Sequence, residues 1–336
     1  MMLKNTKFND SEMARMASIL IKYYHFHKKQ KDIAQEMGIS PGLVNTILSQ
    51  AKKNGFVQNL ISMPKENVLA AHVQELFSPD IPTPNAIVVP FSKNISERER
   101  LRGIGVAAAR YFEAIARDGI HITLDGGETI FCMIEELRRA FSQIEVYSVA
   151  GGPQYDPYTS VNLLVNCLLV QFGATRMNPH ILPGPRDKDL PIYRKKAQNT
   201  LKAASKADVF FLGVGALGRS LSRTNRKNMD DLGIDYKKLQ DRGIVGISAY
   251  SAFDAEGEHV VCELDEKILK VAPEQIKKAA RSRNRHVVIL AYGLPKVKAL
   301  RAMLKGGWGN CLITDSSTAE KLLHKNERIS KHFTPI

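Results

Sequence analysis

The chain has 336 residues, which corresponds to about two domains when one domain takes ~100–200 residues. An apolar share of 44% and a charged share of 24% are those of an ordinary globular protein, and they exclude a disordered, collagen-like or coiled-coil chain. With 48 Lys and Arg against 34 Asp and Glu, the formal net charge of +14 favours a polyanionic partner.

The cysteines and the apolar stretches exclude further classes of protein. The four cysteines lie far apart without a CxxC pair, so we predict neither a metal site nor a disulfide framework. The first residues lack the apolar run of a signal peptide, and the most apolar stretch, residues 161–170, is too short to span a bilayer. We therefore expect a soluble, cytoplasmic protein with no membrane partner.

The first helices of the chain predict a two-helix motif with a tight turn. Residues 10–24 predict a helix, because apolar side chains recur there at three- and four-residue steps. A second helical pattern starts at Gln30, and its residue Met37 is followed directly by Gly38. Two short helices that cross steeply need a small residue where they touch, here Ala34, and a glycine that takes a positive φ at the turn.

The helix after this turn begins with a clear start signal. Ser40 is suited to the N-cap and Pro41 to the first helical position, and the helix should run to about Lys53. Through residue 60, nine Lys and Arg stand against four acids. We therefore predict a helix-turn-helix DNA-binding domain over residues 1–60, in preference to a helical hairpin without a DNA partner.

The third helix supplies the predicted contacts to double-stranded operator DNA. Lysines near its end neutralise phosphates and give affinity without sequence preference, while base reading falls to its exposed start. The predicted DNA-contacting residues are Ser40, Gly42, Asn45, Thr46, Ser49, Lys52 and Lys53. Asn45 is the best candidate for a bidentate contact to adenine, and a merely solvated polar side chain is the alternative at each position.

Residues 61–85 predict a linker, and residues 86–336 predict a second, larger domain. The linker contains a short amphipathic helix at residues 68–77, which is a candidate oligomerisation contact, and three prolines follow it. In the larger domain apolar runs alternate with helical patterns, at residues 86–89, 120–124, 146–149, 209–212, 287–291 and 310–314. This alternation predicts an α/β, Rossmann-like domain whose parallel sheet is covered on both faces.

Glycine-rich loops follow four of these strands, at residues 125–129, 150–153, 213–218 and 292–296. Ligands of parallel sheets bind at the carboxyl ends of the strands, where such loops lie. The third loop matches G-x-G-x-x-G, but a polar, non-periodic stretch follows it instead of a helix, so we expect no nicotinamide cofactor. Two side chains stay open: Lys296 either reaches an anionic ligand or is solvated, and Asp254 is either a ligand carboxylate or the first residue of a turn.

The helix-turn-helix followed by this order of loops resembles the SorC family of bacterial transcriptional regulators, which is often grouped with DeoR-type sugar regulators. The resemblance covers essentially the whole chain. Its best-matched segments are residues 207–215 (ADVFFLGVG), residues 246–257, which end in FDAEG, and residues 300–319, which contain KGGW and LITD.

The resemblance implies an effector domain related to sugar-phosphate isomerases, deaminases and CoA-transferases, with binding in place of catalysis. It implies a nucleoid-associated homodimer or homotetramer in which a sugar, polyol or sugar phosphate controls operator affinity. It also implies a pocket lined by Gly126, Gly127, Glu128, Thr129, Gly151, Gly152, Asp254 and Lys296. The loops themselves add Asp125, Gly213 and Gly215 as candidates.

Two departures from the family pattern concern function. Family members usually carry a serine and then an aromatic residue at the positions of Asp125 and Gly126, and a non-acidic residue at that of Glu128. Two carboxylates beside a helix start repel a phosphate dianion unless they point away or Lys296 and a neighbouring Arg offset them. Otherwise the effector is a free sugar or polyol. Thr46 stands where the family usually has an arginine, which leaves the operator sequence open.

Two alternatives compete with an effector-responsive regulator. The larger domain could be an active sugar-phosphate isomerase or deaminase fused to a DNA-binding module, with acid and base among Asp125, Glu128, Asp254 and His259. The chain could also bind DNA constitutively and carry a vestigial pocket. No spacing of these residues demands catalysis, so we expect a regulator that is not an enzyme and needs no cofactor or metal.

Overall fold

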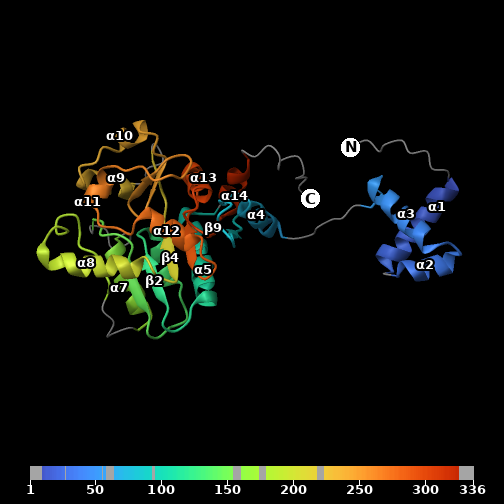
Figure 1. Cartoon of the computed structure of the whole chain (residues 1–336), viewed down its shortest axis with the longest axis horizontal. Coiled ribbons are helices and arrows are strands. Elements are labelled where there is room, and N and C mark those ends of the chain that lie inside the picture. The colour runs from blue at the N-terminus through green and yellow to red at the C-terminus, as the bar shows by residue number, and fades with distance from the viewer. Residues whose placement is uncertain are drawn as a thin grey trace. The chain divides into compact units, whose positions relative to one another are not determined.

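The structure is a computed structural model that describes residues 10–26, 28–54, 56–57, 64–92, 95–153, 160–173, 179–217 and 223–324. The chain forms two compact units, Met1–Met63 and Pro64–Ile336 (Figure 1). Each unit has its own hydrophobic core, so each is described by itself.

The smaller unit is built from three helices. They are α1 (Asp10–Leu20), which continues into a π-helical turn (Ile21–His25), α2 (Gln30–Met37) and α3 (Pro41–Lys53). Their apolar faces meet in one core of Met16, Ile19, Ile33, Ala34, Val44, Ile47, Leu48 and Ala51. Both helices of the predicted motif are therefore present, and the predicted small residue of α2 is buried between them.

The turn between α2 and α3 has the predicted geometry. Gly38 ends α2 with φ of 64°, a left-handed conformation that costs a glycine little. The Ser40 side chain then accepts a hydrogen bond from the Leu43 N–H, and Pro41 occupies the first helical position of α3. The sequence signals for the turn and for the start of the third helix are confirmed.

Helix α4 (Lys65–Gln74) belongs to the larger unit. Its residues Leu69 and Val73 are buried in that unit's core, together with Phe77 and Ile81. Apolar burial therefore attaches this segment to the sheet domain, where the sequence suggested a linker over residues 61–85. Residues 61–63 lie outside the described residues.

The larger unit is organised around a six-stranded parallel sheet in the order β1-β9-β8-β4-β2-β3. Its strands are β1 (Asn85–Val89), β2 (His121–Leu124), β3 (Glu145–Ser148), β4 (Val209–Leu212), β8 (His286–Leu290) and β9 (Cys311–Asp315). All six apolar runs predicted from the sequence form these strands. Their continuous apolar character reflects a sheet that is buried on both faces.

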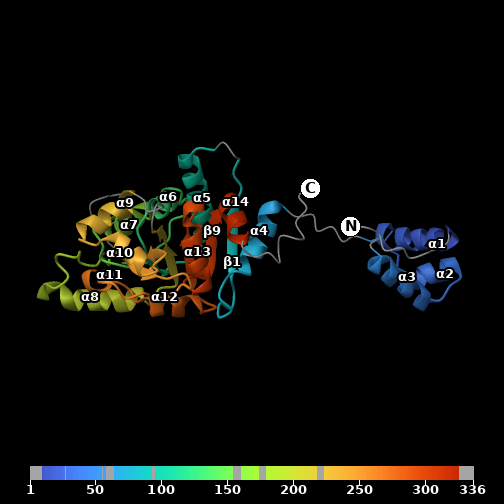
Figure 2. The ribbon, with the colours of Figure 1, turned by 90° about the horizontal axis from the view of Figure 1, so that it is seen from above.

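Helices cover both faces of this sheet, as Figure 2 shows. One face carries α5 (Glu97–Ile115), α6 (Glu128–Glu135) and α7 (Val161–Gln171). The other carries α4, α8 (Pro191–Ala204), α12 (Pro273–Ala280), α13 (Val297–Lys305) and α14 (Ser316–Leu323). The alternation of strand side chains divides the core accordingly: Phe211 faces the first group of helices, and Phe210 faces the second.

A small antiparallel sheet, which the sequence analysis did not predict, lies beside the main one. It consists of β5 (Gly215–Ala216), β6 (Gly246–Ser248) and β7 (Ser251–Phe253). Helices α9 (Arg223–Asp231), α10 (Tyr236–Asp241) and α11 (Glu263–Lys267) flank it in sequence. Helix α9 begins at Arg223, within the polar stretch that follows the third glycine loop, and residues 218–222 lie outside the described residues.

Two of the segments that carry the family resemblance pack directly against each other. Gly257, with φ of 78°, lies so close to Gly306 that a Cβ on Gly257 would stand 2.7 Å from the Gly306 Cα. The fully buried Trp308 donates its indole N–H to the Gly257 carbonyl at 2.7 Å, and its ring lies 5.2 Å from that of Phe253. These residues form a structural joint between the small sheet and α13.

None of the described helices combines the length and the apolar content that a membrane crossing requires.

Candidate functional site

A cavity of about 310 Å³ opens at the carboxyl ends of the neighbouring strands β2, β4 and β8. The chain runs from β2 outward to β3 and then returns to β4 on the other side of β2. In parallel sheets such a reversal leaves a crevice between the loops that leave the two strands, and ligands bind there. The cavity therefore lies where the sequence analysis expected a ligand.

The cavity gathers most of the predicted effector-binding residues. Those that line it are Asp125, Gly126, Gly127, Glu128, Thr129, Gly213, Gly215 and Lys296. Gly127 is the N-cap of α6 and has φ of 124°, so the chain turns there in a conformation that suits glycine. Glu128 is exposed at the first position of α6, whereas Thr129 is buried.

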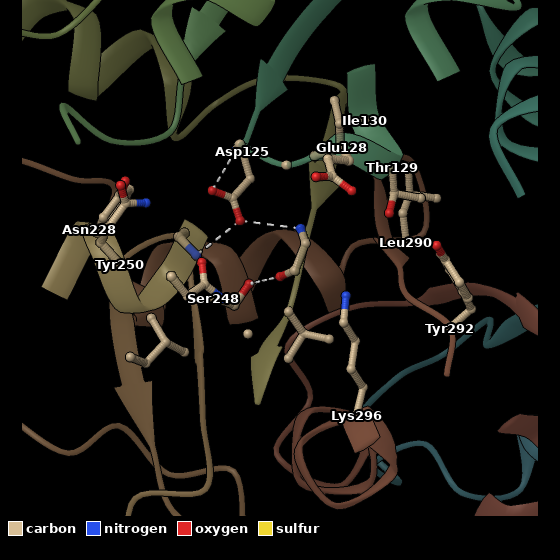
Figure 3. A pocket seen from close by; sticks show the side chains of 18 of the residues that line it. Asp125, Glu128, Thr129, Ile130, Asn228, Ser248, Tyr250, Leu290, Tyr292 and Lys296 are labelled. Carbon is tan, nitrogen blue, oxygen red and sulfur yellow. Dashed lines mark hydrogen bonds between the residues drawn. The ribbon is translucent and has the colours of Figure 1, made fainter. Parts of the chain in front are cut away.

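Asp125 holds three separate segments of the cavity wall together (Figure 3). Its carboxylate accepts hydrogen bonds from the backbone N–H groups of Gly126 at 2.8 Å, Ala249 at 3.1 Å and Gly213 at 3.2 Å. These donors belong to the loop after β2, the turn between β6 and β7, and the loop after β4. Because Asp125 is only 7% exposed, its carboxylate mainly accepts hydrogen bonds from the protein's own backbone.

The ionisation of Asp125 predicts a pH-dependent stability. Burial raises the pKa of Asp125 from 3.8 to about 6, and the three N–H donors oppose that rise. A carboxyl with a raised pKa binds its proton more tightly in the folded state than in the unfolded state. The protonated Asp125 therefore contributes fully to the unfolding free energy below pH 3.8, and this contribution is lost as the pH rises through about 6. Relative to an Asp125→Asn variant, the wild type should lose roughly 3 kcal/mol of unfolding free energy over this range.

The fluorescence of Trp308, the single tryptophan of the chain, reports unfolding of the larger unit and measures this difference in denaturant titrations from pH 4 to 7.5. Since other acids titrate identically in both proteins, only the difference between wild type and variant is diagnostic. A difference that stays constant across this range would contradict the assignment.

Lys296 provides the cation of the cavity. It ends the 3-10 helix Leu294–Lys296, and its side chain extends into the cavity (Figure 3). Its ammonium makes no ion pair with a described residue, and it lies 6.0 Å from the centre of the Tyr292 ring. Burial lowers the pKa of Lys296, while the carboxylates of Glu128 and Glu97 act in the opposite direction. A half-buried cation of this kind is suited to hydrogen-bond the oxygens of a ligand.

Further lining residues were not among the candidates from the sequence. They are Glu97, Leu101, Ile130, Val214, Asn225, Asn228, Met229, Ile247, Ser248, Ala249, Tyr250, Leu290 and Tyr292. Ser248 donates its hydroxyl to the Gly213 carbonyl at 2.7 Å, which ties the small sheet to the third loop. Ala249 and Tyr250 have φ of 48° and 54°, values that turns usually assign to Gly or Asn. Because this turn contains Ala and Tyr instead of Gly or Asn, the sequence gives no signal that predicts it.

Three predicted residues lie outside the cavity lining. Asp254 is a turn residue, because its carboxylate accepts the N–H groups of Glu256 and Glu258, each at 2.9 Å. Gly151 is required for close packing, since a Cβ there would lie 2.0 Å from the Pro183 carbonyl oxygen. Gly152 lines a separate cavity of about 260 Å³. We therefore remove these three residues from the candidate site.

The residues that the sequence predicts to contact DNA lie together on one side of α3. Ser40, Gly42, Asn45, Thr46, Ser49, Lys52 and Lys53 are exposed, whereas Val44, Ile47, Leu48 and Ala51 of the same helix are buried. The Thr46 hydroxyl donates to the Gly42 carbonyl at 3.0 Å, so part of its hydrogen-bonding capacity is used within the helix. Asn45 has no such partner among the described residues, which leaves its amide for an external ligand.

Comparisons with known proteins agree with this architecture. The family described as "Putative sugar-binding domain" matches residues 70–324. The sorbitol operon regulator of Klebsiella pneumoniae is 24% identical over 94% of this chain and 99% of its own length. The deoxyribonucleoside regulator of Bacillus subtilis is 22% identical over 90% of this chain and 95% of its own length.

Solved structures show the same fold. The full-length sorbitol operon regulator SorC from Klebsiella pneumoniae superimposes with a TM-score of 0.65 at 21% identity, covering 94% of this chain and 100% of that one. A transcriptional regulator from Streptococcus pneumoniae gives a TM-score of 0.64 at 20% identity, covering 78% of this chain and 97% of that one. With its sugar-binding domain matched over most of its length, the chain belongs to the SorC family of sugar-responsive transcriptional regulators.

Proposed function

We propose that this protein binds an operator through α3 and that a polyhydroxyl effector in the cavity of the larger unit changes its affinity for that operator. The observation that carries the proposal is the Lys296 ammonium, which forms no ion pair with a described residue and lies in a cavity at the strand ends. The same chain exposes the polar face of a helix-turn-helix. We further propose that the protein acts in the cytoplasm at the nucleoid, as a homodimer or homotetramer. The protein would then consist of a DNA-binding domain near residues 1–60 and an effector domain that begins at about residue 64.

The effector biases one of two arrangements of the subunits, and this changes the spacing of the recognition helices on DNA. Coupling of this kind is typically worth ~1–3 kcal/mol, which corresponds to about 5- to 150-fold in operator affinity. Operators selected from random-sequence duplex DNA with the full chain provide the probe. Fluorescence anisotropy with and without candidate sugars and polyols then measures the change. A selected operator whose affinity no effector alters, although an effector binds, would contradict the proposal.

The Asn45→Ala variant should lose specific operator affinity, whereas Lys52→Ala should weaken all DNA binding about equally. A bidentate asparagine–adenine contact is worth about 1–3 kcal/mol, and a phosphate contact contributes the same to every sequence. Anisotropy titrations on operator and on random DNA separate the two effects, and the salt slope should fall by about one for Lys52→Ala. Gln50→Ala, which changes an exposed α3 residue outside the predicted contacts, is the matched control. Equal losses on both DNAs for Asn45→Ala would contradict the placement of the reading face.

We propose that the cavity does not catalyse a reaction. Of the four acid and base candidates, Asp254 and His259 lie outside the cavity lining, and His259 is hydrogen-bonded to Asp265 at 3.0 Å. Asp125 is engaged by three backbone donors, so Glu128 is left without a partner acid or base from this set. Turnover of an aldose phosphate or amino-sugar phosphate by the purified protein would overturn this part of the proposal.

A further inference from the structure

The backbone N–H groups that converge on Asp125 form a small anion-binding nest. The N–H groups of Ala249 and Gly213 both donate to Oδ2 of Asp125, at 3.1 and 3.2 Å, and the N–H of the adjacent Gly126 donates to Oδ1 at 2.8 Å. Converging N–H groups of this kind favour an anion, such as a phosphate or a carboxylate. In this chain the protein fills the nest with its own carboxylate, which is 7% exposed.

The occupied nest removes donors that an anionic ligand would use. The N–H groups of Gly126 and Gly213 line the cavity, but both already donate to Asp125. The start of α6 behind the nest carries the exposed Glu128 in its first turn, and this carboxylate offsets the positive end of the helix dipole. A phosphate group that entered here would meet a resident carboxylate where it needs N–H donors.

The charges of the cavity lining also disfavour a phosphate ligand. Among the described lining residues, Lys296 is the single Lys or Arg. The carboxylates of Glu128 and Glu97 act on its ammonium, and Asp125 belongs to the same lining. A phosphate dianion would therefore add negative charge to a lining whose described residues already have a negative formal balance. Neutral hydroxyl groups suit it better, because they donate to the carboxylates and accept from the Lys296 ammonium. The labelled Ser248, Tyr250, Tyr292 and Asn228 side chains add neutral polar groups to the same lining (Figure 3).

We propose that the effector of this protein is an uncharged polyhydroxyl compound, a free sugar or polyol, and that Asp125 takes the place of the phosphate group of a sugar phosphate. This inference rests on the proposed function, because it specifies the ligand of the proposed effector cavity. It assigns Asp125 as the specificity-determining residue: the carboxylate keeps the three loops assembled and excludes a second anion from the nest.

Inorganic phosphate tests the nest without knowledge of the effector. Phosphorus NMR and calorimetric titrations of the full chain should show no saturable phosphate binding to the wild type in the millimolar range. The Asp125→Ser variant removes the carboxylate from the nest. It should bind phosphate at least about tenfold more tightly, because the freed backbone N–H groups can then donate to a charged phosphate oxygen. Asp189→Ser, which removes an exposed carboxylate outside the cavity lining, controls for the change in net charge.

Each outcome decides the inference. Saturable phosphate binding by the wild type that Lys296→Met abolishes would overturn it, because the cavity would then accept an anion beside Asp125. An Asp125→Ser variant that keeps the native Trp308 emission and gains no phosphate affinity would overturn it as well. If that variant does not fold, Asp125→Asn replaces it, since the amide keeps one acceptor oxygen while it removes the charge, and a smaller gain in phosphate affinity is expected.

A second arm compares free sugars and hexitols with their phosphate esters by thermal shift. In each matched pair that binds, the free compound should act at the lower concentration, and a preference for the esters would overturn the inference. If no compound of either kind binds, the proposed function fails instead, and the phosphate titration still decides whether Asp125 occupies an anion nest. The two failures are therefore distinguishable.

Discussion

Replacement of Gly257 with alanine is expected to lower the unfolding free energy of the larger unit by about 4 kcal/mol. Gly257 has φ of 78°, and a Cβ there would lie 2.1 Å from the Ala302 carbonyl oxygen and 2.7 Å from the Gly306 Cα. These two atoms and the Gly306 nitrogen, at 2.9 Å, all belong to backbone, so no side chain can rotate away to make room. The shift would also disturb the hydrogen bond from the Trp308 indole to the Gly257 carbonyl.

Gly243 offers a matched control for this substitution. Its φ of 79° is nearly the same as that of Gly257, but nothing lies within 4 Å of a Cβ built on it. Gly243→Ala therefore measures the cost of the left-handed conformation alone, about 1–2 kcal/mol. Urea titrations followed by Trp308 fluorescence compare the two variants. Equal losses for both would show that the close approach of the two backbones contributes nothing.

Removal of the ammonium of Lys296 is expected to raise the effector concentration for a half-maximal change in operator affinity by about 10- to 100-fold. Lys296→Met keeps the length of the side chain and deletes the one cation of the described cavity lining, and a hydrogen bond from a charged donor is worth about 1.5–3 kcal/mol. Operator binding in the absence of effector should stay unchanged, because Lys296 belongs to the larger unit and α3 to the smaller one. The measurement is an effector titration of operator anisotropy.

Lys298 is the matched control for Lys296, since it lies two residues further along the chain, is exposed and does not line the cavity. Lys298→Met changes the net charge by the same amount and should leave the effector response at the wild-type level. An unchanged response in Lys296→Met would mean that the ammonium contacts no effector atom. A loss in both variants would mean that net charge, and not a contact in the cavity, sets the response.

The segments that carry the family resemblance turn out to have two different physical roles. Residues 213 and 215 of the first segment line the cavity, whereas the other two segments supply the joint of Gly257, Gly306 and Trp308. From the sequence, Asp254 was either a ligand carboxylate or the first residue of the turn that ends at Gly257, and the family resemblance favoured the ligand. Only the contact with α13 shows that this glycine is required for backbone packing.

Local signals in the sequence determined the secondary structure and the order of the layers. Periodic apolar residues, the glycine at the turn and the cap at Ser40 specify α2 and α3 through contacts within a few residues. The six apolar runs specify the strands of the main sheet, because a strand that is buried on both faces must be apolar throughout. The short strands β5, β6 and β7 escaped prediction, since two or three residues around an Ala-Tyr turn show neither periodicity nor a turn signal.

The tertiary structure alone decided what the cavity residues do. The sequence placed Asp125, Glu128 and Lys296 at strand ends, so their approach to one cavity followed from the parallel sheet. Two of the three donors to Asp125 belong to segments nearly 90 and more than 120 positions further along the chain. No local pattern encodes such contacts, because they arise when the order of the strands brings three loops to one point. The sequence alone therefore could not predict that the Asp125 carboxylate fills a nest of backbone N–H groups.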